Sequence, residues 1–129
     1  MSQYDIKVNF GLILLGALVL GEVSDKFIKS HLPMTETAFY VLLSLQVPRH
    51  GYGIIKYTSK LTSGRIKLGS GTIYGTINKM LRDGMIEVYD DRENKIIYVI
   101  TEVGKAVLDA EKERIVHLYR DSLTAETED

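Results

Sequence analysis

Apolar residues that follow Thr35 recur with the three- and four-residue spacing of amphipathic α-helices. Thr35 has the residue type of a helix N-cap, and the apolar surface of residues 38–45 ends before Pro48, which terminates the helix. A second helix is predicted over residues 51–61, because Thr62-Ser63-Gly64 is a sequence that ends helices. Two helices in close succession are therefore expected in this part of the chain.

A third helix is predicted from Ser70, its expected N-cap, to about Asp83, with Gly84 as the usual stop just past its end. Residues 66–68, which connect it to the second helix, are expected to form a short pairing strand. The apolar side chains of the third helix share one stripe and should face the core. They are Ile73, Ile77, Met80 and Leu81.

Beyond the third helix the hydrophobic pattern changes to the composition and alternation of β-strands. Residues 85–89 and 96–100 are rich in β-branched and aromatic types and predict two strands, and the polar residues 90–95 between them predict a turn. Thr101 is expected to cap a last helix that runs from Glu102 to about Ser122.

The order of these elements, three helices followed by a hairpin and a helix, is that of a winged helix-turn-helix. The predicted fold class is mainly α with a small β-hairpin (α+β), in which N- and C-terminal helices form a dimer interface. We expect residues 1–34 to be a helical extension used in dimerisation and residues 35–101 to be the DNA-binding domain. Residues 102–129 would supply a dimerisation helix and an acidic tail that frays from about Thr124.

The stretch 10–20 is an uninterrupted apolar run within a helix predicted from about Val8 to Ser30, which Pro33 ends. Its eleven residues are fewer than the ~20 that an α-helix needs to cross a bilayer. No small-residue cleavage site of a signal peptide follows it. We interpret the run as a helix buried inside the protein or in a subunit interface, with a membrane-associated segment as the alternative.

The last predicted helix carries apolar residues at the seven-residue spacing of a helix–helix seam, as at Leu108 and Ile115. With the apolar helix of residues 10–20 beside it, this helix would bury a subunit interface. The alternative is that both helices cover the core of a single chain. The residues predicted at the dimer interface are Leu12, Leu15, Val19, Leu108, Ile115, Leu118 and Tyr119.

The composition is that of an ordinary globular protein, since 45% of the 129 residues are hydrophobic and 26% are charged. The absence of cysteine excludes disulfides, thiolate nucleophiles and Cys-based zinc sites. The three histidines, His31, His50 and His117, lack the spacing of metal ligands and receive no chemical role. No Gly-rich phosphate loop or nucleophile–base arrangement is present. We therefore expect a cytoplasmic protein without metal, cofactor or enzymatic activity.

The net charge of −1 conceals an uneven distribution along the chain. Residues 37–82 contain seven Lys and Arg residues and no Asp or Glu, whereas residues 83–129 contain six basic and thirteen acidic residues. Surfaces that bind phosphates exclude carboxylates, because each carboxylate repels the polyanion. The acid-free block favours a nucleic-acid partner, although a helix pair with a basic solvated face would give the same pattern.

The polar side of the third helix has the side chains that read a DNA major groove. Asn78 suits an adenine edge, and Lys79 and Arg82 suit phosphates or guanine acceptors; a merely solvated helix face would also be polar. The hydroxyls of Tyr52 and Tyr74 suit phosphates if these residues are not part of the core. The candidate DNA-binding residues in the acid-free block are Tyr52, Lys56, Arg65, Lys67, Ser70, Thr72, Tyr74, Gly75, Asn78, Lys79 and Arg82.

Arg92 and Lys95 stand in the hairpin turn, where the wing of a winged helix reaches the DNA backbone or the minor groove. Both are predicted to contact DNA. The neighbouring acids Asp90, Asp91 and Glu93 should weaken that contact, so the wing is expected to contribute less than the fold alone suggests.

Four sequence blocks resemble the PadR-like family of transcriptional regulators, in the right order and at family-like spacing. They are Gly-Tyr-Gly-Ile-Ile at 51–55, Leu-Gly-Ser-Gly-Thr-Ile-Tyr-Gly at 68–75, Leu-Arg-Asp-Gly-Met-Ile at 81–86 and Tyr-Val-Ile-Thr-Glu-Val-Gly at 98–104. The resemblance covers about residues 35–104 and is far more specific than any one block.

The resemblance implies a homodimeric winged-helix repressor that binds a palindromic operator, with the helix that begins at the Ser-Gly-Thr-Ile-Tyr block in the major groove. It also implies dimerisation through the last helix and, in some members, aromatic or drug-like effectors at the dimer interface. This chain departs from the family in its longer segment before Thr35 and in having no tryptophan. Effector stacking on an indole therefore does not carry over, and any effector of this chain is unknown.

The leading hypothesis is thus a sequence-specific transcriptional regulator that binds double-stranded DNA as a homodimer, with no membrane partner. The alternative from another class is a winged-helix module that docks a protein through the apolar run at residues 10–20.

Overall fold

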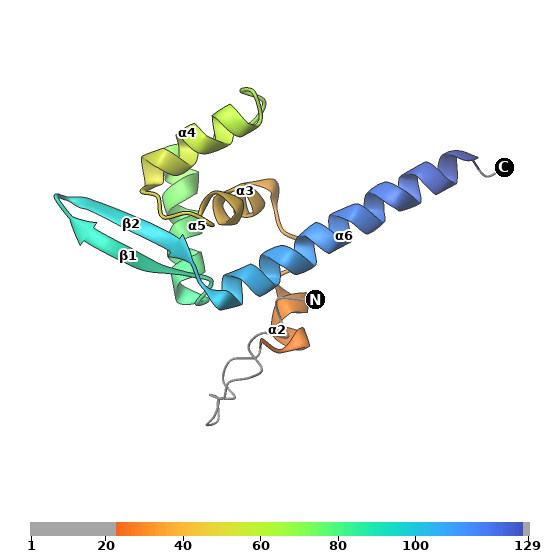
Figure 1. The fold of residues 1–129 in the computed structure, drawn as a ribbon, viewed down its shortest axis with the longest axis horizontal. Coiled ribbons are helices and arrows are strands. Elements are labelled where there is room, and N and C mark those ends of the chain that lie inside the picture. Colours follow the sequence, from red (N-terminus) through yellow and green to blue (C-terminus); the bar gives the residue numbers. More distant parts are fainter. Residues whose placement is uncertain (1–22, 128–129) are drawn as a thin grey trace. The chain divides into compact units, whose positions relative to one another are not determined.

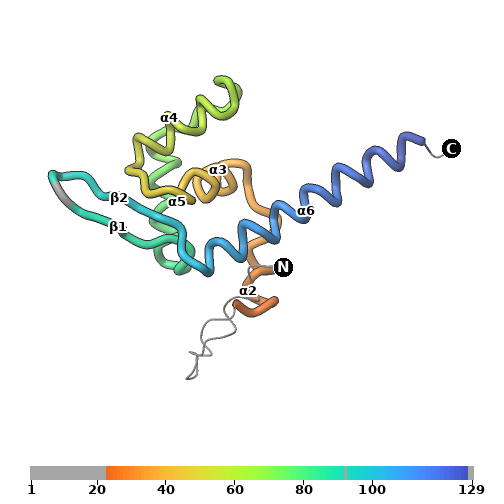
Figure 2. The backbone as a smooth tube through the Cα atoms, in the orientation of Figure 1, coloured from red at the N-terminus to blue at the C-terminus, as the bar shows by residue number. Residues whose placement is uncertain are grey.

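The structure, a computed structural model, describes residues 23–127, with the exception of the Arg92 side chain. Figures 1 and 2 show its helices and its hairpin: α2 (Asp25–Ser30), α3 (Glu36–Ser44), α4 (Gly51–Leu61), α5 (Ser70–Arg82), β1 (Ile86–Arg92), β2 (Lys95–Ile100) and α6 (Glu102–Thr127). The predicted fold class, mainly helical with a small antiparallel hairpin, is confirmed. The chain divides into two compact units, one of residues 34–105 and one of residues 1–33 with 106–129.

The unit of residues 34–105 is built around α5, which packs against α3, α4 and β1, while α4 also packs against β2. Its core includes Leu42, Ile54, Ile73 and Ile77, all with no exposed surface. The predicted cap of α3 is confirmed, because the Thr35 hydroxyl accepts the Ala38 N–H at 3.0 Å. The three helices and the hairpin thus share one apolar core, and their outer faces remain available for a partner.

The helix α5 begins one residue earlier than expected, and the prediction of Ser70 as its N-cap is wrong. Gly69 has the extended N-cap backbone and its carbonyl accepts the Ile73 N–H at 2.9 Å, while Ser70 is already helical. No side chain caps this end of α5. The end of the helix is as predicted, with Asp83 as the C-cap and Gly84 at a positive φ of 74°.

Residues 66–68 do not form the predicted strand. The chain turns at Ser63 and Gly64, whose φ values are positive, and Ile66 donates its N–H to the Thr62 hydroxyl at 3.0 Å. The segment that pairs with the hairpin instead precedes α4. Arg49 and Tyr98 exchange two backbone hydrogen bonds, of 3.0 and 2.9 Å, and so attach β2 to the connection between α3 and α4.

The hairpin turn is shorter than the predicted six residues. Only Glu93 and Asn94 form it, with φ values of 54° and 65°, so that the flanking acids belong to β1 and Lys95 begins β2. Asparagine tolerates a left-handed backbone, which explains why the chain reverses here. The register between β1 and β2 shifts after Val88, and this irregularity leaves Tyr89 without a partner on β2.

The junction between β2 and α6 is tightly fixed. The Thr101 hydroxyl donates to the Gly84 carbonyl at 2.7 Å and accepts the Gly104 N–H at 3.1 Å, which confirms the predicted cap. Gly104 is buried, and a Cβ atom placed on it would overlap the Met85 carbonyl oxygen. The helix α6 continues to Thr127, five residues beyond the predicted end, so the first residues of the acidic tail are helical instead of frayed.

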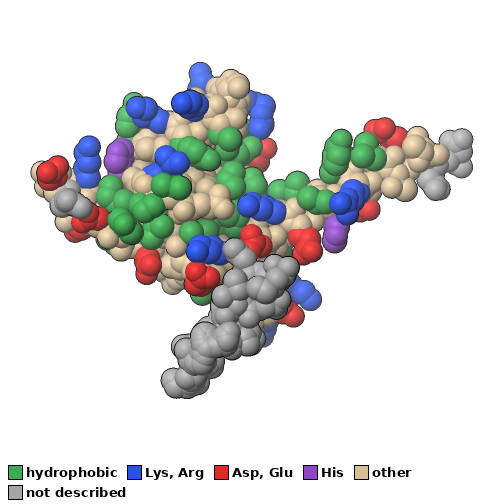
Figure 3. Space-filling view, viewed as in Figure 1, with side chains coloured by type: hydrophobic (Ala, Val, Ile, Leu, Met, Phe, Trp, Pro, Cys, Tyr) green, Lys and Arg blue, Asp and Glu red, His purple; other side chains and the backbone are tan. Residues whose placement is uncertain are grey.

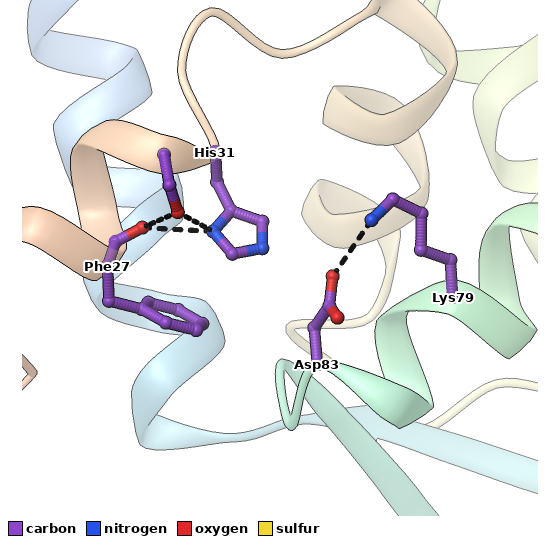
Figure 4. A network of polar contacts seen from close by, with 5 residues as sticks. Phe27, His31, Lys79 and Asp83 are labelled. Carbon is purple, nitrogen blue, oxygen red and sulfur yellow. Dashed lines mark hydrogen bonds and ion pairs between the residues drawn. The ribbon is translucent and has the colours of Figure 1, made fainter.

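In the other unit, the short helix α2 is capped by Ser24, whose hydroxyl accepts the Phe27 N–H at 3.1 Å. Near its end the His31 Nδ1 atom lies 3.0 Å from the Phe27 carbonyl and 3.1 Å from the Ser30 hydroxyl (Figure 4). The predicted helix over 8–30 is described only from Asp25 onward. The apolar run 10–20, with Leu12, Leu15 and Val19, lies outside the described residues.

The helix α6 separates the predicted dimer residues into two groups. Leu108 is 1% exposed in the single chain, so it packs inside the chain and is not free for a partner. By contrast, Ile115, Leu118 and Tyr119 are 39%, 54% and 64% exposed. Between the groups, buried Glu111 binds Arg114 through two contacts of 2.7 Å, and this hydrogen bonding raises the pKa of Arg114. None of the described helices is long and apolar enough to cross a membrane.

Candidate nucleic-acid interface

The outward face of α5 has the composition expected of a recognition helix. Ile73, Ile77 and Met80 are buried as predicted, and Leu81 is half-buried. The opposite side is exposed and polar or basic, apart from the Tyr74 ring, the two glycines and the half-buried Thr76. Its exposed residues are Ser70, Gly71, Thr72, Tyr74, Gly75, Asn78, Lys79 and Arg82.

Lys79 has an acidic neighbour on the same helix. Its Nζ atom lies 3.1 Å from the Asp83 Oδ2 atom, and its side chain remains 66% exposed (Figure 4). Exposed ion pairs of this kind contribute little to stability. A phosphate could therefore replace Asp83 as the partner of the Lys79 ammonium group at a small cost in free energy. Arg82 is exposed as well and can contact a phosphate directly.

The beginning of α4 places Tyr52 beside two other ring or charged groups. The Tyr52 side chain is 61% exposed, its ring is parallel to that of His50 at 6.5 Å, and the Lys56 ammonium group lies 5.6 Å from its centre. His50 caps the helix, because its Nδ1 atom accepts the Gly53 N–H at 3.0 Å. This role was not predictable from the sequence, since histidine is not among the common capping residues.

Gly51 on α4 is in close contact with the Tyr74 ring on α5. A Cβ atom on Gly51 would overlap the Tyr74 hydroxyl and lie 2.6 Å from its Cζ atom. Only glycine lets the ring lie here, with Tyr74 46% exposed at the surface. The first glycine of the Gly-Tyr-Gly motif thus determines where the Tyr74 hydroxyl is presented.

The cations of the acid-free block are mostly on the surface, and Figure 3 shows Lys and Arg side chains gathered over α4. Lys56, Lys60 and Lys67 are exposed. Arg65 is exposed too, and it donates to the Tyr40 hydroxyl at 3.1 Å. Arg49 differs from the rest.

Arg49 is half-buried and serves the fold. Its Nε–H donates to the Ser44 carbonyl at 2.8 Å, and its guanidinium group stacks 4.0 Å from the centre of the Tyr57 ring. Composition alone does not separate Arg49 from the exposed cations of the acid-free block, because its contacts with Ser44 and Tyr57 form only once the chain folds.

The wing combines one exposed cation with several acids. Lys95 is exposed at the start of β2, and the side chain of Arg92 lies outside the described part of the chain. Asp91 and Glu93 are exposed, and the Asp90 carboxylate accepts the Asp91 N–H at 2.8 Å. The electrostatic contribution of the wing tip is therefore mixed, as the sequence predicted.

The fold and this face together define a DNA-binding winged-helix transcription regulator. The sequence pattern of the transcriptional regulator PadR-like family matches residues 40–110, more than half of the chain. The chain belongs to the PadR-like family of transcriptional regulators. A search of curated proteins finds no match to it.

Several solved structures share the fold of this chain. A transcriptional regulator from Clostridium thermocellum, Cth-833, is 20% identical with a TM-score of 0.56, over 82% of this chain and 99% of that one. A PadR family regulator from hypervirulent Clostridium difficile R20291 is 18% identical with a TM-score of 0.54, over 70% and 99%. Bacillus subtilis PadR in complex with operator DNA is 20% identical with a TM-score of 0.54, over 70% of this chain and 60% of that one.

Proposed function

We propose that this protein is a repressor that binds a palindromic operator as a homodimer, in the cytoplasm. The observation that carries the proposal is the exposed polar and basic face of α5 at the end of an acid-free block of 46 residues. A helix with such a face enters the major groove, and two copies related by a two-fold axis read two half-sites. Bacillus subtilis PadR, one of the similar structures, is bound to operator DNA.

In this proposal, different residues of α5 contact the bases and the phosphates of the DNA. Asn78 contacts a base edge, and Lys79 and Arg82 contact phosphates or a guanine. Thr72, Tyr74 and Gly75 lie against the groove wall, and Ser70 and Tyr52 hydrogen-bond to backbone phosphates at the ends of α5 and α4. The other cations, Lys56, Arg65, Lys67, Arg92 and Lys95, add phosphate contacts.

The first experiment selects duplexes from a randomised pool with the full chain and measures the affinity of the selected duplex at several salt concentrations. We expect a palindromic site and an affinity that falls steeply with salt. Replacing both Lys79 and Arg82 by alanine should weaken binding by about 10–100-fold and reduce the salt slope by about 2, near one for each lost phosphate contact. The melting temperature should hardly change, because both side chains are exposed.

Lys112→Ala is the matched control, because Lys112 is an exposed cation on α6 outside the proposed interface. It should leave both affinity and salt slope as in the parent chain. If Lys112→Ala lost as much affinity as the double variant, the effect would come from net charge and not from contacts of α5. The absence of any selected sequence would contradict the proposed function.

The position of Tyr74 is tested through Gly51. In Gly51→Ala the new methyl group displaces the Tyr74 ring, so we expect operator affinity to fall about tenfold or more, in the range of a lost phosphate or base contact. Gly53→Ala is the control on the same helix, because the nearest atom to its Cβ is 3.6 Å away, an ordinary contact. If both variants bind operator DNA like the parent, Tyr74 does not contribute to the interface.

A further inference from the structure

A cleft of about 370 Å³ lies between the hairpin, the first turn of α4 and the second turn of α5. Its lining includes His50, Tyr52, Tyr74, Lys95 and Tyr98, and no described residue that lines it is acidic. The cleft therefore joins three parts of the winged-helix unit through side chains that donate hydrogen bonds or carry positive charge.

Tyr98 is the unusual member of this lining. It is 6% exposed, and its hydroxyl makes no hydrogen bond to any described residue. Among the described residues, the Thr58 hydroxyl is the only fully enclosed side-chain polar atom without a partner, so the Tyr98 hydroxyl, at the end of a buried ring, is open to the cleft. The pKa of Tyr98 is raised above its ordinary value, mainly by burial and to a smaller extent by the neighbouring Tyr74 and Asp91. The hydroxyl therefore stays protonated at neutral pH and remains a donor.

The other groups at the cleft suit an anion in the same way. Lys95 supplies an exposed ammonium group at the hairpin, and the eleven-residue helix α4 begins at Gly51 with the positive end of its dipole. Tyr74 brings a second hydroxyl from the second turn of α5. The cleft walls are held together, because the backbone bridge between Arg49 and Tyr98 attaches β2 to the segment before α4.

We propose that this cleft binds one phosphodiester group of the DNA backbone, with Tyr98, Tyr74 and Lys95 as its donors. The proposal rests on the proposed function and adds Tyr98, a core residue, to the DNA-binding set. A free phosphate or carboxylate would satisfy the same donors. The DNA backbone is favoured because Tyr74 also belongs to the exposed face of α5, so that a strand in the groove beside α5 passes the cleft mouth.

The test is Tyr98→Phe, which removes the hydroxyl and keeps the buried ring. We expect operator affinity to fall about tenfold, as for the loss of a hydrogen bond to a charged group, with no lower melting temperature because no intramolecular hydrogen bond is lost. The salt slope should stay unchanged, whereas Lys95→Gln should weaken binding and reduce the slope by about 1. Tyr89→Phe is the control, because exposed Tyr89 is in the same hairpin and does not line the cleft.

The source of the anion is tested by placing a neutral methylphosphonate at each position of the operator in turn. At one position in each half-site, we expect the methylphosphonate to lower the affinity of the parent chain about tenfold. At that position it should lower the affinity of Tyr98→Phe very little, because this variant has already lost the contact. Tyr98→Phe binding like the parent chain would overturn the proposal and leave the proposed function intact. So would millimolar inorganic phosphate shifting the Tyr98 ring resonances while every methylphosphonate duplex bound normally. A parent chain that binds no duplex at all would instead refute the proposed function.

Discussion

Gly104→Ala is expected to lower the free energy of unfolding by about 3 kcal/mol, the upper range for overpacking a core. The added methyl group would overlap the Met85 carbonyl oxygen and lie 2.8 Å from the Ile100 Cγ1 atom. The carbonyl is backbone and accepts the Thr101 N–H at 3.0 Å, so it cannot move away without breaking the start of α6. Thermal unfolding should show a decrease in Tm on the order of 10 °C.

Gly75→Ala is the matched control for this substitution. A Cβ atom on Gly75 meets nothing within 4 Å, and the residue lies inside α5, where alanine favours the helix by about 1 kcal/mol over glycine. Its Tm should therefore rise. If Gly104→Ala unfolds at the parent temperature, the packing of Gly104 against Met85 is not the constraint that the structure indicates.

The helices of the winged-helix unit and their order could be predicted from the sequence, because their signals are local. Thr35 and Thr101 cap helices through residues three positions away, and Gly84 ends α5 through its own backbone. The Ser70 cap failed by one residue, since two glycines and a serine in a row offer several starting points. The hairpin turn failed because Asp90 and Asp91 have turn-like composition although they pair in β1.

What the sequence could not provide are contacts between distant positions. Arg49 pairs with Tyr98 across about two thirds of the winged-helix unit, and the Gly51–Tyr74 contact joins two helices. Neither contact has a periodicity or a composition that reveals it. The exposed face of α5 was predictable from its period, whereas the cleft at Tyr98 depends on three elements meeting and emerges only in the fold.

The remaining large effect concerns α6 and the proposed homodimer. The residues Ile115, Val116, Leu118, Tyr119 and Leu123 are large, apolar and at least 39% exposed. At 3.6 residues per turn they fall on one side of the helix, with Tyr119 near the middle. A contiguous apolar stripe of this kind is typical of a surface that another chain covers. We therefore propose it as the subunit interface, with Leu108 inside the chain and not part of it.

Tyr119→Glu is expected to raise the dimer dissociation constant about 100-fold or more, because a two-fold interface would bury the new carboxylate twice. The fold of the single chain should persist, since Tyr119 is 64% exposed there. Sedimentation equilibrium measures the dissociation constant, and Thr124→Glu adds the same charge on the other side of α6 as a control. Because a monomer reads only one half-site, Tyr119→Glu should also weaken binding to the full operator while leaving binding to an isolated half-site unchanged. A Tyr119→Glu chain that remains dimeric would place the subunit interface elsewhere.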